Sequence, residues 1–255
     1  TLTIENDAPI SKLTFVKTND NLDDFATISS NGNLTINSAV YKVNDESVDI
    51  QTNGTITLPK TTETTNEIGN LNVASGTTSI ETINANSISV ETSASLEVSS
   101  SITSQSIANN GSINGLASVS TKGLENSGVI EIKGNFTCDG VVNSSGTLKA
   151  KEIVLGNSST EDTVTIGKKE NDVISGSLSG EKITFYGKKN IIYPNIEATN
   201  EINFYRQIES KNNDLVIKAP TIKTNDSVTI DGGSLKFDGI YQNDSATTVK
   251  TNLTV

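Results

Sequence analysis

Paired carboxylates are the first feature of this sequence that could do chemistry, because they can hydrolyse glycosidic bonds or hold calcium. Two pairs are adjacent in the chain, Asp23-Asp24 and Glu161-Asp162. On a strand, neighbouring side chains point to opposite faces, so neither pair is placed to flank one sugar. Asp231-Gly232-Gly233 matches only part of a calcium-binding nonapeptide and indicates a tight turn. We therefore expect solvated charge at these positions.

Nucleophilic and metal chemistry have little support. The chain has no His, and Cys138 is its one Cys. A Ser-His-Asp triad, a Cys-His nucleophile and a His/Cys zinc site are thereby excluded. We predict no catalytic, cofactor-binding or metal-binding residue and no cofactor. Cys138 is expected to be a small buried apolar side chain on a strand Phe136-Thr-Cys138.

Aromatic side chains gather late in the chain. Seven of the eleven lie within residues 185–241: Phe185, Tyr186, Tyr193, Phe204, Tyr205, Phe237 and Tyr241. The three phenylalanines end alternating aliphatic segments, so we predict that they point inward. Tyr and Arg are the residue types that most often anchor interfaces. Tyr186, Tyr205, Arg206 and Tyr241 are therefore the predicted recognition residues, and the alternative is that these rings fill a wider C-terminal core.

The elements that must position these residues are short strands of the form aliphatic-x-aliphatic. Each places two apolar side chains on one face and a polar one on the other. We expect the middle residues to be more exposed than their flanks, among them Thr35, Thr57, Ser89, Glu97, Glu131 and Thr165. The clearest copies are Leu34-Thr-Ile36, Ile56-Thr-Leu58, Leu71-Asn-Val73, Ile88-Ser-Val90, Leu96-Glu-Val98, Ile130-Glu-Ile132, Val164-Thr-Ile166, Ile183-Thr-Phe185, Ile202-Asn-Phe204 and Leu235-Lys-Phe237.

A turn precedes many of these strands at a nearly regular interval. Gly32, Gly54 and Gly76 stand 22 residues apart, and Gly111, Gly128 and Gly146 stand 17 and 18 apart. We expect the Asn-Gly and Ser-Gly pairs to supply positive φ. At about 20 residues per coil, the period predicts roughly 12 stacked coils. Glu131 and Lys149 occupy corresponding positions of adjacent coils and are expected to form an ion pair.

The predicted fold class is all-β, a right-handed parallel β-helix (β-solenoid) forming a single elongated domain. Residues 1–30 are expected to form an N-terminal cap or irregular first coil, and residues 31–255 the coils, richer in aromatics from about residue 180. Antiparallel hairpins and a β-sandwich are the alternatives. The sandwich is disfavoured because the chain has no Trp and no Cys pair.

Charge and composition exclude further classes. The formal net charge is −11, which provides no basic field for nucleic acid. No segment has the roughly 20 apolar residues of a membrane span, so we expect no membrane insertion by this segment. The chain contains no Met, even at position 1, so we expect a processed product or a fragment.

Residues 31–170 resemble the passenger domains of bacterial autotransporters and two-partner-secreted, filamentous-haemagglutinin-type adhesins. The likeness lies in Asn-x-Gly turns, aliphatic-x-aliphatic strands and few Cys, as in residues 124–134, Leu-Glu-Asn-Ser-Gly-Val-Ile-Glu-Ile-Lys-Gly. The resemblance implies a right-handed parallel β-helix on a bacterial surface. It carries over no binding residues, because these families share no site motif.

The expected function is that of a non-catalytic, secreted or surface-displayed bacterial adhesin or stalk fragment, displayed outside the cell at the outer membrane. Its expected partner is a host-cell surface protein or a glycan, with no nucleic acid, and self-association is compatible with this role. Two alternatives stay open: a polysaccharide-degrading β-helix enzyme, either lyase or hydrolase, and a passive structural surface-layer protein.

Overall fold

The chain is all-β and folds as a parallel β-solenoid of about 10 turns, which confirms the predicted fold class. The computed structural model describes residues 67–225 and 228–255 and, before residue 67, the strands alone; side chains are described from residue 70 on, except at Ile80. No helix occurs among these residues, so none of them belongs to a helix that could cross a membrane. The right-handed winding stays a prediction.

Two compact units make up the chain, Thr1–Val119 and Ser120–Val255. The predicted division at residue 30 falls where no side chain is described and stays a prediction. In that segment Leu2–Ile4 pairs in parallel with Thr27–Ser30.

Unit 1 consists of parallel strands that return to the same side once per coil. Pairings include β4 with β8, β8 with β10, β10 with β11, and β11 with β12, all parallel, whereas β7 with β8 is antiparallel. Its strands are β1 (Leu2–Ile4), β2 (Ala8–Ile10), β3 (Leu13–Thr14), β4 (Thr27–Ser30), β5 (Leu34–Ile36), β6 (Ala39–Val40), β7 (Lys42–Val43), β8 (Glu46–Thr52), β9 (Ile56–Leu58), β10 (Glu67–Val73), β11 (Gly76–Val90), β12 (Ala94–Asn109) and β13 (Ser112–Gly115), and β14 (Ser118–Asn126) spans the division between the units.

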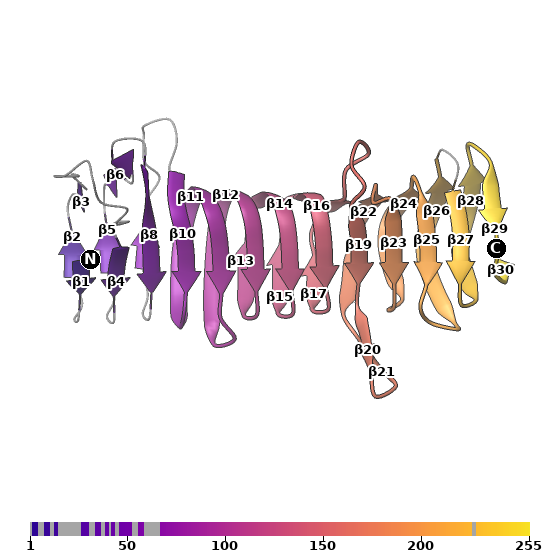
Figure 1. The fold of residues 1–255 in the computed structure, drawn as a ribbon, viewed down its shortest axis with the longest axis horizontal. Coiled ribbons are helices and arrows are strands. Elements are labelled where there is room, and N and C mark those ends of the chain that lie inside the picture. The colour runs from indigo at the N-terminus through magenta and orange to yellow at the C-terminus, as the bar shows by residue number, and fades with distance from the viewer. Residues whose placement is uncertain are drawn as a thin grey trace. The chain divides into compact units, whose positions relative to one another are not determined.

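Unit 2 repeats the same plan, with strands running in the same direction in successive coils (Figure 1). One pair is antiparallel, β20 with β21. The strands are β15 (Val129–Ile132), β16 (Phe136–Ser144), β17 (Thr147–Lys149), β18 (Glu152–Leu155), β19 (Thr163–Ile166), β20 (Lys168–Glu170), β21 (Val173–Ser175), β22 (Ser177–Phe185), β23 (Lys189–Ile192), β24 (Ile196–Phe204), β25 (Gln207–Ser210), β26 (Leu215–Thr224), β27 (Val228–Gly232), β28 (Leu235–Asn243), β29 (Thr247–Val249) and β30 (Leu253–Thr254).

The apolar residues of the dyads point inward, as predicted. Ser89, Glu97, Glu131 and Thr165 are each more exposed than the buried residues on either side of them. Thr35 and Thr57, which carried the same prediction, lie outside the residues whose side chains are described. The inward and outward assignment of the sequence register is therefore confirmed where side chains are described.

Strand register stacks the inward residues of unit 2 into columns. One column contains the chain's lone Cys and two of its phenylalanines, because each residue pairs directly with its equivalent in the next coil. The rings of Phe185 and Phe204 stack with centroids 4.8 Å apart, and Phe237 adds a further ring at 6.4 Å from Phe204. The column runs Cys138, Leu155, Phe185, Phe204, Thr224 and Asn243.

The glycines of the recurring turns act differently from the prediction. Gly111 and Gly146 do not have positive φ. A Cβ at Gly111 would lie 2.2 Å from the Glu91 carbonyl oxygen, and one at Gly146 would lie 2.0 Å from the Gly128 carbonyl oxygen. Glycine is required there because the backbone of the preceding coil passes too close for any side chain.

One coil of unit 2 is longer than its neighbours, which is one reason for fewer turns than the predicted 12. Val129 and Thr147 are register partners 18 residues apart, but Thr147 and Ser177 are 30 apart. The added residues lie in a loop, residues 156–162, and in the hairpin β20–β21. The hairpin projects beyond the ends of β19, β23 and β25 in Figure 1.

The aromatic column should dominate the stability of unit 2. Phe204 is fully buried between two other rings, so Phe204→Ala is expected to lower the free energy of unfolding by about 3–5 kcal/mol. Urea denaturation measures this loss. Val141→Ala, at a side chain 47% exposed, is the matched control and should change the free energy by less than about 0.5 kcal/mol. Equal effects of the two changes would contradict the assigned core.

Candidate recognition surface

Three of the four predicted recognition residues meet at one corner of unit 2. Tyr186 and Tyr205 directly follow the register partners Phe185 and Phe204. Their backbone amides donate to the preceding coils, Tyr186 to the Leu155 carbonyl oxygen at 2.8 Å and Tyr205 to that of Phe185 at 3.1 Å. The two half-buried rings stack with centroids 4.3 Å apart and an interplanar angle of 29°. We call this set, with Arg206, the tyrosine corner.

Arg206 fastens the loop of residues 156–162 to the tyrosine corner. Its Nη1 donates to the Thr160 carbonyl oxygen at 3.0 Å, and its Nη2 donates to the Ser158 carbonyl oxygen. The guanidinium thus spans from the coil of Tyr205 to a loop more than 40 residues earlier. In this arrangement the one Arg of the chain has a structural use, and its role in recognition stays a prediction.

The same loop is held at further points, which account for one of the acidic pairs. Asn157 Nδ2 donates to Asp139 Oδ1 at 2.9 Å. Glu161 forms an ion pair with Lys188, and Asp162 accepts a hydrogen bond from Thr160. Glu161 and Asp162 therefore bind different partners rather than one ligand. Asp23 and Asp24, the other pair, lie outside the described residues.

Tyr241 is not part of the tyrosine corner. It pairs in register with the buried Ile222 and so continues an inward column. Its ring centroid lies 5.2 Å from that of Phe237. Its hydroxyl oxygen lies 2.9 Å from Thr224 Oγ1 and 3.2 Å from Thr247 Oγ1. Tyr241 thus follows the alternative interpretation, in which a ring fills the C-terminal core.

The predicted inward positions of Phe185, Phe204 and Phe237 are confirmed, since each is at most 1% exposed. Cys138 is also fully buried, and burial raises the pKa of its thiol to about 12. Such a thiol stays protonated and unreactive at neutral pH. Asp231 Oδ1 accepts the Gly232 amide at 2.8 Å, and Gly232 has a φ of 96°, so this segment is the predicted tight turn.

Two charged clusters were not anticipated from the sequence. In the first, Glu201 lies between lysines of the coils before and after it, with Lys182 Nζ at 3.0 Å and Lys223 Nζ at 2.5 Å. Asn203 Nδ2 also donates to Glu201 Oε1 at 2.8 Å. The hydrogen bonds from Asn203 and Lys223 lower the pKa of Glu201 to about 2.

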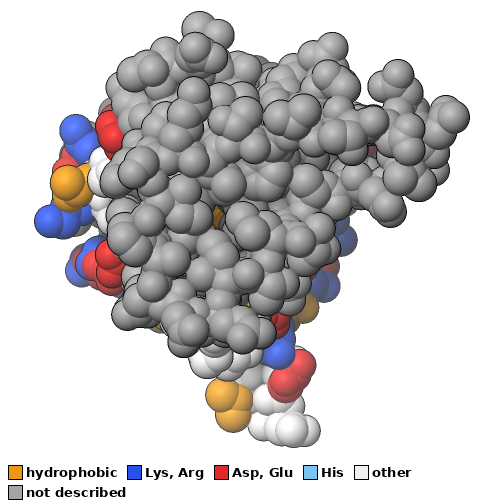
Figure 2. Space-filling view, turned by 90° about the vertical axis from the view of Figure 1, so that its left-hand side faces the viewer, with side chains coloured by type: hydrophobic (Ala, Val, Ile, Leu, Met, Phe, Trp, Pro, Cys, Tyr) orange, Lys and Arg blue, Asp and Glu red, His pale blue; other side chains and the backbone are white. Residues whose placement is uncertain are grey.

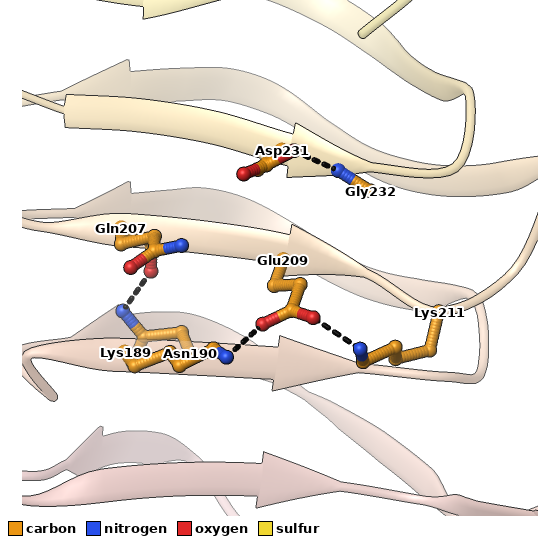
Figure 3. A network of polar contacts seen from close by, with 7 residues as sticks. All are labelled: Lys189, Asn190, Gln207, Glu209, Lys211, Asp231 and Gly232. Carbon is orange, nitrogen blue, oxygen red and sulfur yellow. Dashed lines mark hydrogen bonds and ion pairs between the residues drawn. The ribbon is translucent and has the colours of Figure 1, made fainter. Parts of the chain in front are cut away.

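The second cluster lies on the same coil at Glu209. Figure 3 shows its carboxylate between the ammonium groups of Lys189 and Lys211. Burial alone would raise the pKa of Glu209, but the two lysines outweigh it and the pKa is lowered. Below these groups the buried Asn190 donates to the Gln207 carbonyl oxygen at 2.9 Å. Lysines spaced one coil from each glutamate were the available signal, but spacing alone does not distinguish them from other surface charge.

These clusters join coils rather than hold a ligand. The predicted Glu131–Lys149 ion pair is present at 2.6 Å, and Glu197–Lys218 repeats it at 2.8 Å. Across the described residues no group of three or more Cys, Asp or Glu side chains is arranged to hold a metal ion. The outward carboxylates with lowered pKa are thus each neutralised by lysines from neighbouring strands.

Glu201 should make stability depend on pH. Its pKa is lower in the folded protein than the ordinary value of 4.5, so its ion pairs stabilise the fold fully above pH 4.5 and lose that effect as the pH falls toward 2. Glu201→Gln is expected to cost about 1 kcal/mol at pH 7, allowing for solvent screening, and nothing near pH 2. Denaturation at several pH values measures this difference. The exposed Glu181, changed to Gln, is the control, and a cost of E201Q that persists at pH 2 would contradict the assignment.

Arg206 should control the order of the loop. With Arg206→Ala the Ser158 and Thr160 carbonyl oxygens lose their donors, so amides of residues 156–163 are expected to exchange hydrogen faster, with a lower melting temperature. Hydrogen exchange by mass spectrometry measures this, and Lys236→Ala, elsewhere in unit 2, is the control. Unchanged exchange and melting, together with weakened binding to a ligand, would instead support the tyrosine corner as a recognition surface.

The comparisons with known proteins found no matching family model, no matching curated protein and no matching solved structure.

Proposed function

We propose that this chain is a non-catalytic, secreted or surface-displayed bacterial adhesin or stalk fragment, which presents a β-solenoid surface to a host-cell protein or glycan. The observation that carries the proposal is the cross-linking of coils by outward side chains. Glu131 with Lys149, Glu201 with Lys182 and Lys223, and Glu197 with Lys218 each join neighbouring strands. A surface whose polar groups are bound to one another is suited to holding a scaffold rigid.

Charge on the scaffold is mixed at short range. In Figure 2 basic and acidic side chains appear together where the described surface is coloured, rather than in a field of one sign. Such a surface has little to attract nucleic acid, which needs a basic patch. It agrees with contact to a partner through local features of the scaffold. The resemblance of residues 31–170 to secreted adhesins supports a location outside the bacterial cell.

A binding and product screen tests the proposal. The labelled chain is incubated with a panel of plant, algal and host glycans and with cultured host cells, and both bound chain and released sugars are measured. Saturable binding to one cell type or glycan without new products is the expected result. Shortened or unsaturated sugars would overturn it in favour of a polysaccharide-degrading enzyme. Absence of both binding and products would favour a passive surface-layer role.

A further inference from the structure

The hairpin β20–β21 is an insertion into an otherwise ordinary coil. The Gly167 amide donates to the Ser144 carbonyl oxygen at 2.6 Å, and the Ser177 amide donates to that of Gly146 at 3.0 Å. The preceding coil needs one residue, Ser145, between these two acceptors, whereas this coil has residues 168–176 between its donors. The solenoid wall therefore continues past the hairpin as if it were absent.

The hairpin is ordered by contacts within itself. Its strands pair antiparallel, and the turn residues Asn171 and Asp172 have φ of 48° and 64°, as in the turns that favour two-residue hairpins. Lys168 pairs with Glu170 at 3.1 Å, and Lys169 pairs with Asp172 at 3.0 Å. Internal pairing of this kind holds the hairpin in one shape before it meets a partner, which lowers the entropy cost of binding.

Both insertions of this coil can be compared directly. The loop of residues 156–162 is tied to the wall through Arg206, Asp139 and Lys188. The ion pairs of the hairpin, in contrast, are internal, and it projects from the end of β19 (Figure 1). One insertion is packed down and the other is presented. Rigid scaffolds commonly present binding residues on such projecting segments.

The chemistry of the tip indicates the kind of partner. Val173, next to the turn, is 67% exposed. The two lysines of the hairpin are balanced by Glu170 and Asp172, and residues 168–175 contain no aromatic side chain. In Figure 2 the lowest part of the molecule, where Figure 1 places the hairpin, carries hydrophobic side chains beside acidic and basic ones. A neutral tip with an aliphatic side chain and no ring suits an apolar pocket of a protein rather than a sugar, which favours aromatic stacking.

We infer that the hairpin β20–β21 is the contact element of this chain, and that Val173 inserts into an apolar pocket of a partner protein on the bound cell. The inference rests on the proposed function and specifies its partner as protein. Ile174 and the backbone edges of the hairpin surround the contact, and the paired charges flank it as a polar rim.

Three variants test the inference on the cell type that binds the chain in the screen. Val173→Lys places a charge at the tip. Deletion of residues 168–175 leaves Gly167-Gly176 between Ile166 and Ser177, which matches Ser145-Gly146 between Ser144 and Thr147 in the preceding coil. Ile240→Lys is the matched control, because Ile240 is also 67% exposed. Melting temperatures verify that all three are folded.

Val173→Lys and the deletion are each expected to weaken cell binding by at least about tenfold, while Ile240→Lys binds as the parent does. Trypsin treatment of the cells should abolish binding, and glycosidase treatment should leave it unchanged. Parent-like binding by the deletion variant would overturn the role of the hairpin and leave the proposed function standing. Binding lost to glycosidase but not to trypsin would overturn the protein partner. A screen in which nothing is bound removes the proposed function and this inference together.

Discussion

Parallel register between successive coils is the constraint on which the rest of the structure depends. Backbone hydrogen bonds from one coil to the next place equivalent residues directly over one another, so every position of a coil belongs to a column. An inward column has to be apolar along its length, and an outward column brings like or opposite charges together at each step. Cys138 is buried for this reason, and Glu201 meets lysines from two other coils for the same reason. Gly146 is needed because columns also stack backbone on backbone.

The sequence was sufficient for the features that repeat. Alternating aliphatic residues gave the inward faces, their spacing gave the Glu131–Lys149 pair, and the position of Phe204 within a dyad gave its burial. Features that occur once were not predictable in this way. The hairpin at residues 168–175 interrupts the period without altering the pattern on either side of it. Glu209 depends on two lysines whose separation in sequence, 20 before and 2 after, has no special meaning until the coil is closed.

Function and fold separate clearly in this protein. Most outward polar groups that the structure relates to one another, such as Lys218 with Glu197, join coils and so maintain the scaffold. Of the candidate recognition residues, Arg206 and Tyr241 have partners within unit 2 that also serve packing. The projecting hairpin differs from these groups because it adds nothing that the coil needs. A regular stack that carries one dispensable, self-ordered projection agrees with a protein that displays a contact element.

Cross-linking of engineered cysteines tests the register most directly. Ser179 and Glu197 are register partners on the outward face of adjacent coils, at a strand spacing that a disulfide can span. A chain with Cys at both positions, and Ser at position 138, is predicted to form the disulfide rapidly under mild oxidation without loss of stability. The pair at Ser179 and Thr199, shifted by two residues on the same strand, is predicted not to do so. Equal or preferred cross-linking of the shifted pair would contradict the register and, with it, the columns from which this account is built.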